Sequence, residues 1–246
     1  MIVIVLILLW VVISLFVNLG AYFLPTPLGV GKALWMHVLD GSLLANLSMT
    51  LGRVLSSVVI AAVVGIPVGV LAGTSRRVRH LVMPVVEFAR GIPTSMLFPV
   101  FIVLVGFGES AKIAIALYGT IPVFIVSAFV GVVPRPEVLG RREYLMLHKD
   151  QISRANRAMC LLWEAVPSLV SGTKLALSLA LVLVIVTEMF FVADAGAGWA
   201  AYQAYNAFAF DEMYAYVFVI GLVGLTANVC LDWAVRRIKI VTESGE

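Results

Sequence analysis

The chain has 246 residues, of which 62% are hydrophobic and only 13% are charged, and its mean hydropathy is +1.06. Soluble domains carry about 25% charged residues, so the composition excludes a water-soluble globular protein and indicates a chain embedded in lipid. The net charge of +3 and the pI near 9.0 do not indicate nucleic-acid binding, because the basic residues form short clusters beside apolar runs, as topology signals do.

Six apolar stretches predict six transmembrane helices, because a helix needs about 20 apolar residues to cross the hydrocarbon core. Five of the stretches are free of charge and cover residues 1–31, 54–75, 91–108, 113–134 and 213–231. The stretch at 91–108 is expected to begin earlier, near Leu81. The sixth lies between Lys174 and Asp194 and is interrupted only by Glu188. We therefore expect an all-α membrane protein.

The first stretch is predicted to remain in the protein as a membrane helix. No Lys or Arg precedes Lys32, and the apolar run at residues 2–17 is too long for the hydrophobic region of a signal peptide. The predicted order along the chain is a transmembrane helix at residues 1–24, a periplasmic connection at 25–46, a core domain at 47–240 and a cytoplasmic tail at 241–246.

The basic residues predict the orientation, since cytoplasmic loops carry an excess of Lys and Arg. Basic clusters follow helices two, four and six, at residues 76–79, 135–157 and 236–239. These three segments fall on one side of a six-helix chain. The opposite loops contain Lys32 and Lys112 together with the acidic residues Asp40, Glu109, Asp194, Asp211 and Glu212. We therefore expect both termini in the cytoplasm.

Glycine and proline interrupt helices two to four. Gly65, Pro67 and Gly69 lie in helix two, and prolines also lie in helices three and four. A proline inside a membrane helix frees a backbone carbonyl that hydrocarbon cannot satisfy. One interpretation is simple kinks with close packing through small residues such as Gly65 and Gly69. The other is that helices two to four line a path through the membrane.

The longest polar stretch covers residues 134–167, and its leucines and basic residues predict one or two amphipathic helices. Two interpretations fit its composition equally well. An interfacial helix would rest on anionic lipid headgroups. A docking helix would instead sit in a groove on a soluble partner.

Seven short segments between residues 45 and 240 carry a resemblance to a known family. They are Leu51-Gly52-Arg53-Val54-Leu55, Gly65-Ile66-Pro67-Val68-Gly69, Arg90-Gly91-Ile92-Pro93, Pro99-Val100-Phe101-Ile102, Gly106-Phe107-Gly108-Glu109-Ser110-Ala111-Lys112, Thr187-Glu188-Met189 and Gly196-Ala197-Gly198. In this order they resemble the binding-protein-dependent ABC permeases, and among these the nitrate, taurine and aliphatic sulfonate group. The resemblance implies the type I ABC importer permease fold, a second permease subunit, a periplasmic or lipid-anchored substrate-binding protein and a cytoplasmic ABC ATPase dimer.

The resemblance also implies that residues 134–167 hold the coupling loop that contacts the ATPase. The residues predicted to make this contact are Tyr144, Leu145, Met146, Leu147, His148, Lys149, Asp150, Gln151, Ile152, Arg154 and Arg157. Family members carry Glu-Ala-Ala, three residues and then glycine in this loop. A register anchored on Pro167 and Gly172 places Tyr144-Leu145-Met146 and Asp150 at those positions. A side chain resists the turn that glycine permits. We therefore predict that this chain is the degenerate half of a heterodimer, whose partner permease carries the better-formed motif.

The sequence predicts no enzyme and no bound cofactor. It lacks the Gly-x-x-x-x-Gly-Lys motif of nucleotide-binding loops, so ATP and Mg²⁺ are expected on the partner ATPase. No arrangement of nucleophile, base and oxyanion donors can be assembled from it. His37, His80 and His148 are expected in separate loops without carboxylate or cysteine clusters, so no metal site is predicted.

Charged residues inside the predicted membrane helices require partners, because an unpaired charge in lipid is energetically costly. Glu87 and Arg90, three residues apart, predict an i, i+3 pair or snorkelling, with a gate as the alternative. Glu188 is expected to brace the turn at residues 193–198 through backbone amides rather than to touch substrate. The candidates for the translocation path are Ile92, Pro93, Met96, Phe101 and Val184.

Together these features predict a transport subunit in the bacterial inner membrane that gives a small anionic or polar organic solute a path. One alternative is an ion-coupled secondary transporter, which would place carboxylates or broken half-helices at mid-bilayer. The other is a non-transporting scaffold that recruits a soluble partner. Nitrate, sulfonates, taurine, pyrimidines and aromatic acids are all compatible substrates.

Overall fold

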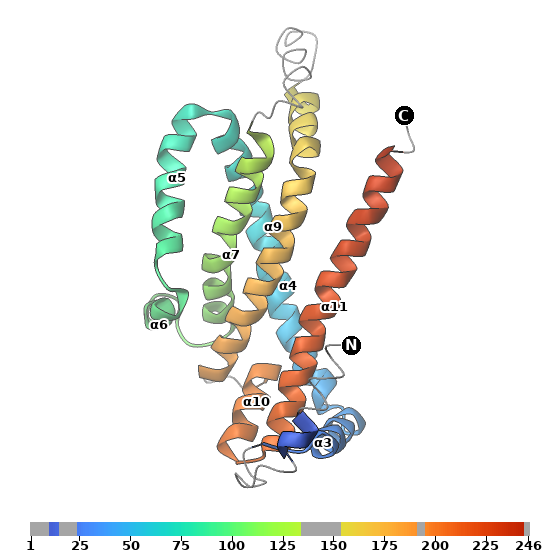
Figure 1. Ribbon diagram of the computed structural model, residues 1–246. Helices are drawn as coiled ribbons and strands as arrows, with labels where there is room; N and C mark the ends of the chain where they lie inside the picture. Colours follow the sequence, from blue (N-terminus) through green and yellow to red (C-terminus); the bar gives the residue numbers. More distant parts are fainter. Residues whose placement is uncertain (1–9, 15–23, 134–153, 191–194, 244–246) are drawn as a thin grey trace.

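The computed structural model describes residues 10–14, 24–133, 154–190 and 195–243, and the regular structure in these ranges is helical (Figure 1). The elements are α3 (Pro27–Leu39), α4 (Ser42–Thr74), α5 (Arg76–Gly91), the 3₁₀ helix η1 (Thr94–Leu97), α6 (Phe98–Val105), α7 (Glu109–Val132), α9 (Arg154–Phe190), α10 (Ala197–Asn206) and α11 (Phe210–Glu243). Residues 10–14 add a short helical segment.

Four helical stretches are long and apolar enough to cross a membrane, namely Ser42–Thr74, Glu109–Val132, Ala165–Phe190 and Phe210–Trp233. The pair Arg76–Gly91 and Thr94–Val105 passes the same test together, but its halves are bent by 89°. The described residues therefore contain four spans, or five if this bent pair is one span. The predicted third helix is two helices that meet at a sharp break. The helix predicted at residues 1–24 falls outside the described residues, except for 10–14 and 24.

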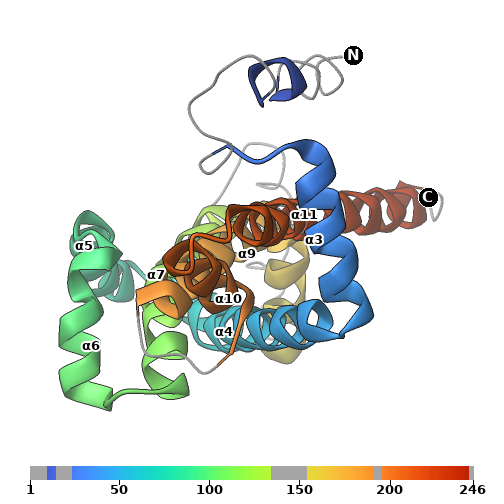
Figure 2. The same ribbon diagram turned by 90° about the horizontal axis from the view of Figure 1, so that it is seen from below.

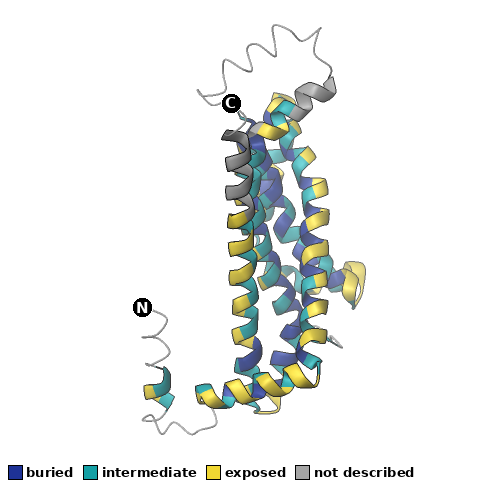
Figure 3. Ribbon diagram, turned by 90° about the vertical axis from the view of Figure 1, so that its right-hand side faces the viewer, coloured by how far each residue is buried: buried dark blue, intermediate teal, exposed yellow. Residues whose placement is uncertain are grey.

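The core of the bundle lies between α4, α7 and α9, which pack side by side (Figure 2). Its buried residues are Val54, Val58, Ala61, Ala116, Phe124, Ala176, Ala180, Leu183 and Val184. Figure 3 shows buried positions on the faces that the long helices turn toward one another. Burial falls from 44% of the apolar stretch in α7 to 11% in α11, so α11 presents most of its apolar surface to the surroundings.

Glycines bring α4 and α7 into close contact. A Cβ atom on Gly65 would lie 2.7 Å from Cβ of Phe124, and one on Gly69 would lie 2.7 Å from Cβ of Ala128. A Cβ on Gly69 would also overlap the carbonyl oxygen of Ile125, so only glycine permits this approach. Small residues at such spacing are typical of tightly packed membrane helices. This is the close packing that the sequence predicted for Gly65 and Gly69.

Several helices include residues that the sequence predicts in loops or connections. The predicted connection at 25–46 contains α3, whose start is capped by the Thr26 hydroxyl, which accepts a hydrogen bond from the Gly29 amide at 3.1 Å. His37 lies in α3 and His80 in α5, so their assignment to loops was wrong. His148 falls outside the described residues.

Charged residues also lie farther inside the helices than predicted. Helix α4 begins at Ser42, well before the charge-free stretch at 54–75, and so contains Arg53. Helix α7 begins at Glu109, so Glu109 and Lys112 are helical and not in a loop as predicted. Both helices begin earlier than predicted, because the prediction assumed that every charged residue near an apolar stretch lies in water.

The described helices define two ends of the bundle. Figure 1 places the C-terminal end of α7, the N-terminal end of α9 and the C-terminal end of α11 at one end. Helices α3 and α10 lie at the opposite end. The two helix ends that flank residues 134–153 in the sequence are therefore on the same side of the protein.

Candidate functional site

Four charged side chains from three helices meet near the end of the bundle that carries α10. We call Arg53, Glu109, Lys112 and Glu188 the ionic cluster. The Nε and Nη2 atoms of Arg53 each donate to one carboxylate oxygen of Glu109 at 2.6 Å, in a bidentate pair. Arg53 Nη1 donates to Glu188 Oε1 at 2.5 Å, and Lys112 Nζ donates to Glu109 Oε1 at 2.8 Å. Arg53 of α4 thus joins α7 to α9.

Within the ionic cluster, the Glu188 side chain is buried and the Glu109 side chain is exposed. Glu188 is 0% exposed, Lys112 is 2% exposed and Arg53 is 6% exposed, whereas the side chain of Glu109 is 57% exposed. Two cations and two carboxylates leave the cluster without net charge. Neutrality and short charge-assisted hydrogen bonds are the conditions under which buried ions are tolerated.

Polar groups of α4 and the start of α10 form the remaining hydrogen bonds to the Glu188 carboxylate. The Gly198 amide donates to Glu188 Oε2 at 2.9 Å, and Thr50 Oγ1 lies 2.9 Å from both carboxylate oxygens. Thr50 Oγ1 also accepts from the Ala197 amide at 2.8 Å, and Arg53 Nη1 donates to the Ala195 carbonyl at 2.9 Å. A carboxylate at the first amides of a helix is favoured by their unpaired N–H groups. The hydrogen bond from Gly198 is the backbone contact that the sequence predicted for Glu188.

The backbone around Gly196 explains why glycine precedes α10. Its φ angle is +134°, a conformation that other residues rarely adopt. A Cβ on Gly196 would also lie 2.6 Å from either carboxylate oxygen of Glu188. The chain can therefore pass over Glu188 only with glycine at this position.

A separate pocket of about 400 Å³ lies between α3, α4, α10 and α11 and is lined by His37, Asp40 and Glu212, among others. Asn46 links the two regions, because its Oδ1 accepts from the Gly196 amide at 3.0 Å and its Nδ2 donates to the Tyr216 hydroxyl at 3.1 Å. Hydrogen bonds from the hydroxyl and the amide of Ser42 lower the pKa of Asp40.

Four of the five predicted path residues lie together at the break between α5 and α6. Ile92 and Pro93 form the break, Met96 in η1 is 70% exposed, and the ring of Phe101 lies edge-on to that of Tyr118 at 5.9 Å. Val184 is separate from them, because it is fully buried in the core between α4, α7 and α9. Its packing does not support a place on a path.

Some of the remaining predicted site residues fall outside the described residues. Glu87 and Arg90 are exposed on α5, and the contacts of the described residues include no ion pair between them, so snorkelling and the gate stay predictions for these two residues. The coupling residues 144–152 fall outside the described residues. Arg154 and Arg157 belong to the first turns of α9.

Comparison with known proteins identifies the family. A model of the family described as binding-protein-dependent transport system inner membrane component matches residues 65–139. A probable ABC transporter permease protein of Brucella melitensis is 30% identical over 219 residues, which cover 89% of this chain and 87% of that relative. The chain belongs to this permease family. The permease is therefore a multi-pass membrane subunit and not an enzyme, and ATP hydrolysis in such systems resides in a separate ATPase subunit.

Other relatives cover nearly the whole permease. The taurine transport system permease protein TauC of Escherichia coli is 25% identical over 244 residues, covering 95% of the permease and 86% of that relative. The nitrate import permease protein NrtB of Synechococcus elongatus is 26% identical over 249 residues, with the same coverage of 95% and 86%. A chain from inward-facing structures of the MetNI methionine ABC transporter matches with a TM-score of 0.63 at 21% identity, over 77% of the permease and 92% of that chain. The permease shares the fold of that chain.

Sequence reasoning identified Glu188 but missed the other members of the ionic cluster. Arg53 is separated from Glu188 by 135 residues and from Glu109 by 56, so no local pattern pairs them. The available signal was that all four residues lie in the segments that carry the family resemblance. The cluster presents its charges to one another rather than to a cavity, which suits it to fixing α4, α7, α9 and α10 together.

Proposed function

We propose that the permease forms half of the translocation path of an ATP-driven importer for a small anionic or polar organic solute. The observation that carries this proposal is the 89° break between α5 and the η1–α6 segment, within a stretch apolar enough to span the membrane. Backbone that leaves the helical path inside a membrane is tolerated where it is buried in protein or lines a water-filled cavity. Ile92, Pro93, Met96 and Phe101 lie at or beside this break.

The ionic cluster divides the permease into a fixed and a movable part in this proposal. Arg53 and Glu188 fasten α4, α7, α9 and α10 to one another. The η1–α6 segment lies beyond that network and has no buried residues among those described. We infer that the α5–α6 break moves against the fixed part when access alternates.

The orientation follows from the ends of the bundle. Residues 76–79 at the start of α5 and 236–239 near the end of α11 are basic, and both lie at the end where α7 finishes and α9 begins. The positive-inside rule favours this end for the cytoplasm. We propose six spans with both termini cytoplasmic, and a periplasmic face formed by α3 and α10 that meets the substrate-binding protein.

The coupling segment at 134–167 would then meet a cytoplasmic ATPase dimer, which holds the ATP and Mg²⁺. Support comes from its position in the sequence between two helix ends on the cytoplasmic side. Relatives named for taurine and nitrate transport support a small anion as the solute. The side chain of Asp150, where the family has glycine, supports a heterodimer with a second permease over a homodimer.

Purification of the tagged permease from its native membrane, followed by identification of every subunit by mass spectrometry, tests this assignment. We expect an ABC ATPase, a second permease of different sequence and a substrate-binding protein. A complex with this permease at both membrane positions would refute the heterodimer. A transport-competent complex without an ATPase would refute the whole proposal.

Reversing two charges at the start of α9 is expected to detach the ATPase. The double variant Arg154→Glu, Arg157→Glu places two negative charges at the predicted coupling segment, where a docking surface for basic residues would repel them. We expect co-purified ATPase to fall at least about tenfold. The matched control is Arg76→Glu, Arg77→Glu, which makes the same charge change on exposed residues of α5 at the same end. Equal ATPase recovery from both variants would contradict the assignment of the coupling segment.

A further inference from the structure

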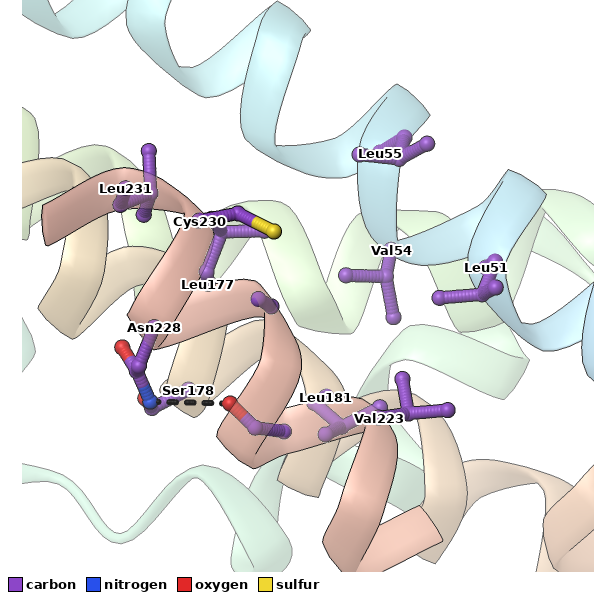
Figure 4. A pocket seen from close by; sticks show the side chains of 12 residues that line it. Leu51, Val54, Leu55, Leu177, Ser178, Leu181, Val223, Asn228, Cys230 and Leu231 are labelled. Carbon is purple, nitrogen blue, oxygen red and sulfur yellow. Dashed lines mark hydrogen bonds between the residues drawn. The ribbon is translucent and has the colours of Figure 1, made fainter. Parts of the chain in front are cut away.

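We propose that the permease binds a phospholipid of the inner leaflet in an apolar groove between α4, α9 and α11, with an acyl chain in the groove and the phosphate at Lys174. The groove has a volume of about 290 Å³. Figure 4 shows leucine and valine side chains from all three helices around it, among them Leu51, Val54, Leu55, Leu177, Leu181 and Val223. The choice of leaflet rests on the proposed orientation.

Small residues on α11 keep the groove open. A Cβ atom on Gly224 would have one atom within 4 Å, Cδ2 of Leu181 at 3.4 Å, so this position faces free space. Helix α11 also diverges from α9 toward its C-terminal end (Figure 1). All three lining helices carry stretches able to cross a membrane. The groove therefore lies at the depth of the hydrocarbon core, where acyl chains are the surrounding solvent.

The end of the groove nearer the start of α9 is charged. Lys174 lies one turn before Leu177 and pairs with Asp232, which directly follows the lining residue Leu231. The Lys174 and Asp232 side chains are 30% and 53% exposed, so both reach the surroundings. The next residue, Trp233, is 62% exposed, as expected of tryptophan at a membrane interface. An apolar groove that ends at a partly exposed lysine, paired with a more exposed carboxylate that a phosphate can replace, matches a molecule with an acyl chain and a phosphate headgroup.

The volume of the groove suits an acyl chain. An apolar cavity of about 150 Å³ holds a benzene molecule, so the groove has room for a longer hydrocarbon segment.

Filling the groove tests the proposal. Native mass spectrometry of the purified full chain, titrated with dioleoyl-phosphatidylethanolamine, gives the affinity of the retained lipid. We expect Gly224→Leu to weaken that affinity at least about tenfold, because the new side chain occupies the groove. Gly221→Leu is the matched control on α11, since a Cβ there meets nothing within 4 Å, and it should retain wild-type affinity. If Gly224→Leu fails to fold, Ala227→Phe fills the same groove.

Two variants of the charged end separate lipid binding from loss of the ion pair. Both Lys174→Gln and Asp232→Asn break the pair, but only the first removes the charge that meets the phosphate. We expect several-fold weaker lipid binding for Lys174→Gln and unchanged or tighter binding for Asp232→Asn. Equal lipid affinity in Gly224→Leu and Gly221→Leu, or a change in oligomeric state of Gly224→Leu without lipid loss, would overturn the proposal. The measurement needs neither ATP nor solute, so its outcome is independent of the proposed transport function.

Discussion

Replacement of Arg53 by Gln is expected to lower the free energy of unfolding of the permease by about 3–5 kcal/mol, the range for breaking a buried ion pair. The substitution leaves Glu188, which is 0% exposed, without its cation, and it also removes the bidentate pair with Glu109. The remaining charges of the ionic cluster would then sum to −1 in a poorly solvated site. Thermal unfolding of the purified permease in detergent, followed by tryptophan fluorescence, measures this loss.

Two controls isolate the ionic cluster as the cause. Arg77→Gln removes an exposed arginine on α5 and should leave the unfolding temperature unchanged. The double variant Arg53→Gln, Glu188→Gln should be more stable than Arg53→Gln alone, because it leaves Glu109 paired with Lys112 and no net charge. An Arg53→Gln permease as stable as Arg77→Gln would show that the cluster does not hold the helices together.

Gly69→Leu is the second change with a large expected effect. Any side chain at this position overlaps the carbonyl oxygen of Ile125 on α7, and backbone cannot move aside as a flexible side chain can. We expect α4 and α7 to separate, with a loss of about 3 kcal/mol or more, at the upper limit for overpacking. The readouts are the yield of monodisperse protein in size-exclusion chromatography and the unfolding temperature.

Gly52→Leu is the matched control for this prediction. Gly52 lies on the same helix, is exposed, and a Cβ there would meet nothing within 4 Å. The substitution should be neutral or slightly stabilising, since leucine is a better helix former than glycine. Equal yields and unfolding temperatures for the two variants would contradict the close packing of α4 against α7.

Much of the fold could be predicted because lipid imposes simple rules on the sequence. Long apolar runs gave four of the spans, and Gly65 and Gly69 correctly indicated close packing. The start signals of α3 were also present, in Thr26 followed by proline, although residues 25–46 were predicted to form a connection. The break at Pro93 was visible as a proline two residues after Gly91, whereas its 89° angle depends on packing that no local pattern encodes.

The ionic cluster could not be predicted from charge patterns alone. Glu109 and Lys112 were read as loop residues because an isolated charge in a membrane helix is unfavourable. In the structure these charges are not isolated, because Arg53 of α4 pairs with Glu109 and with Glu188 of α9. A rule that ends helices at charges fails wherever charges from distant segments neutralise one another. Hydrophobic packing between distant segments places Val184, a predicted path residue, in the core.

Solute uptake into proteoliposomes tests most directly whether this permease moves a solute when an ATPase drives it. The purified assembly would be reconstituted with its binding protein, with taurine, nitrate and an aliphatic sulfonate offered separately. We expect ATP-dependent accumulation of one of them, lost when the ATPase carries an inactive nucleotide site. Hydrolysis of ATP by the intact assembly without accumulation of any solute would instead indicate a scaffold. Accumulation driven by an ion gradient without ATP would indicate a secondary transporter.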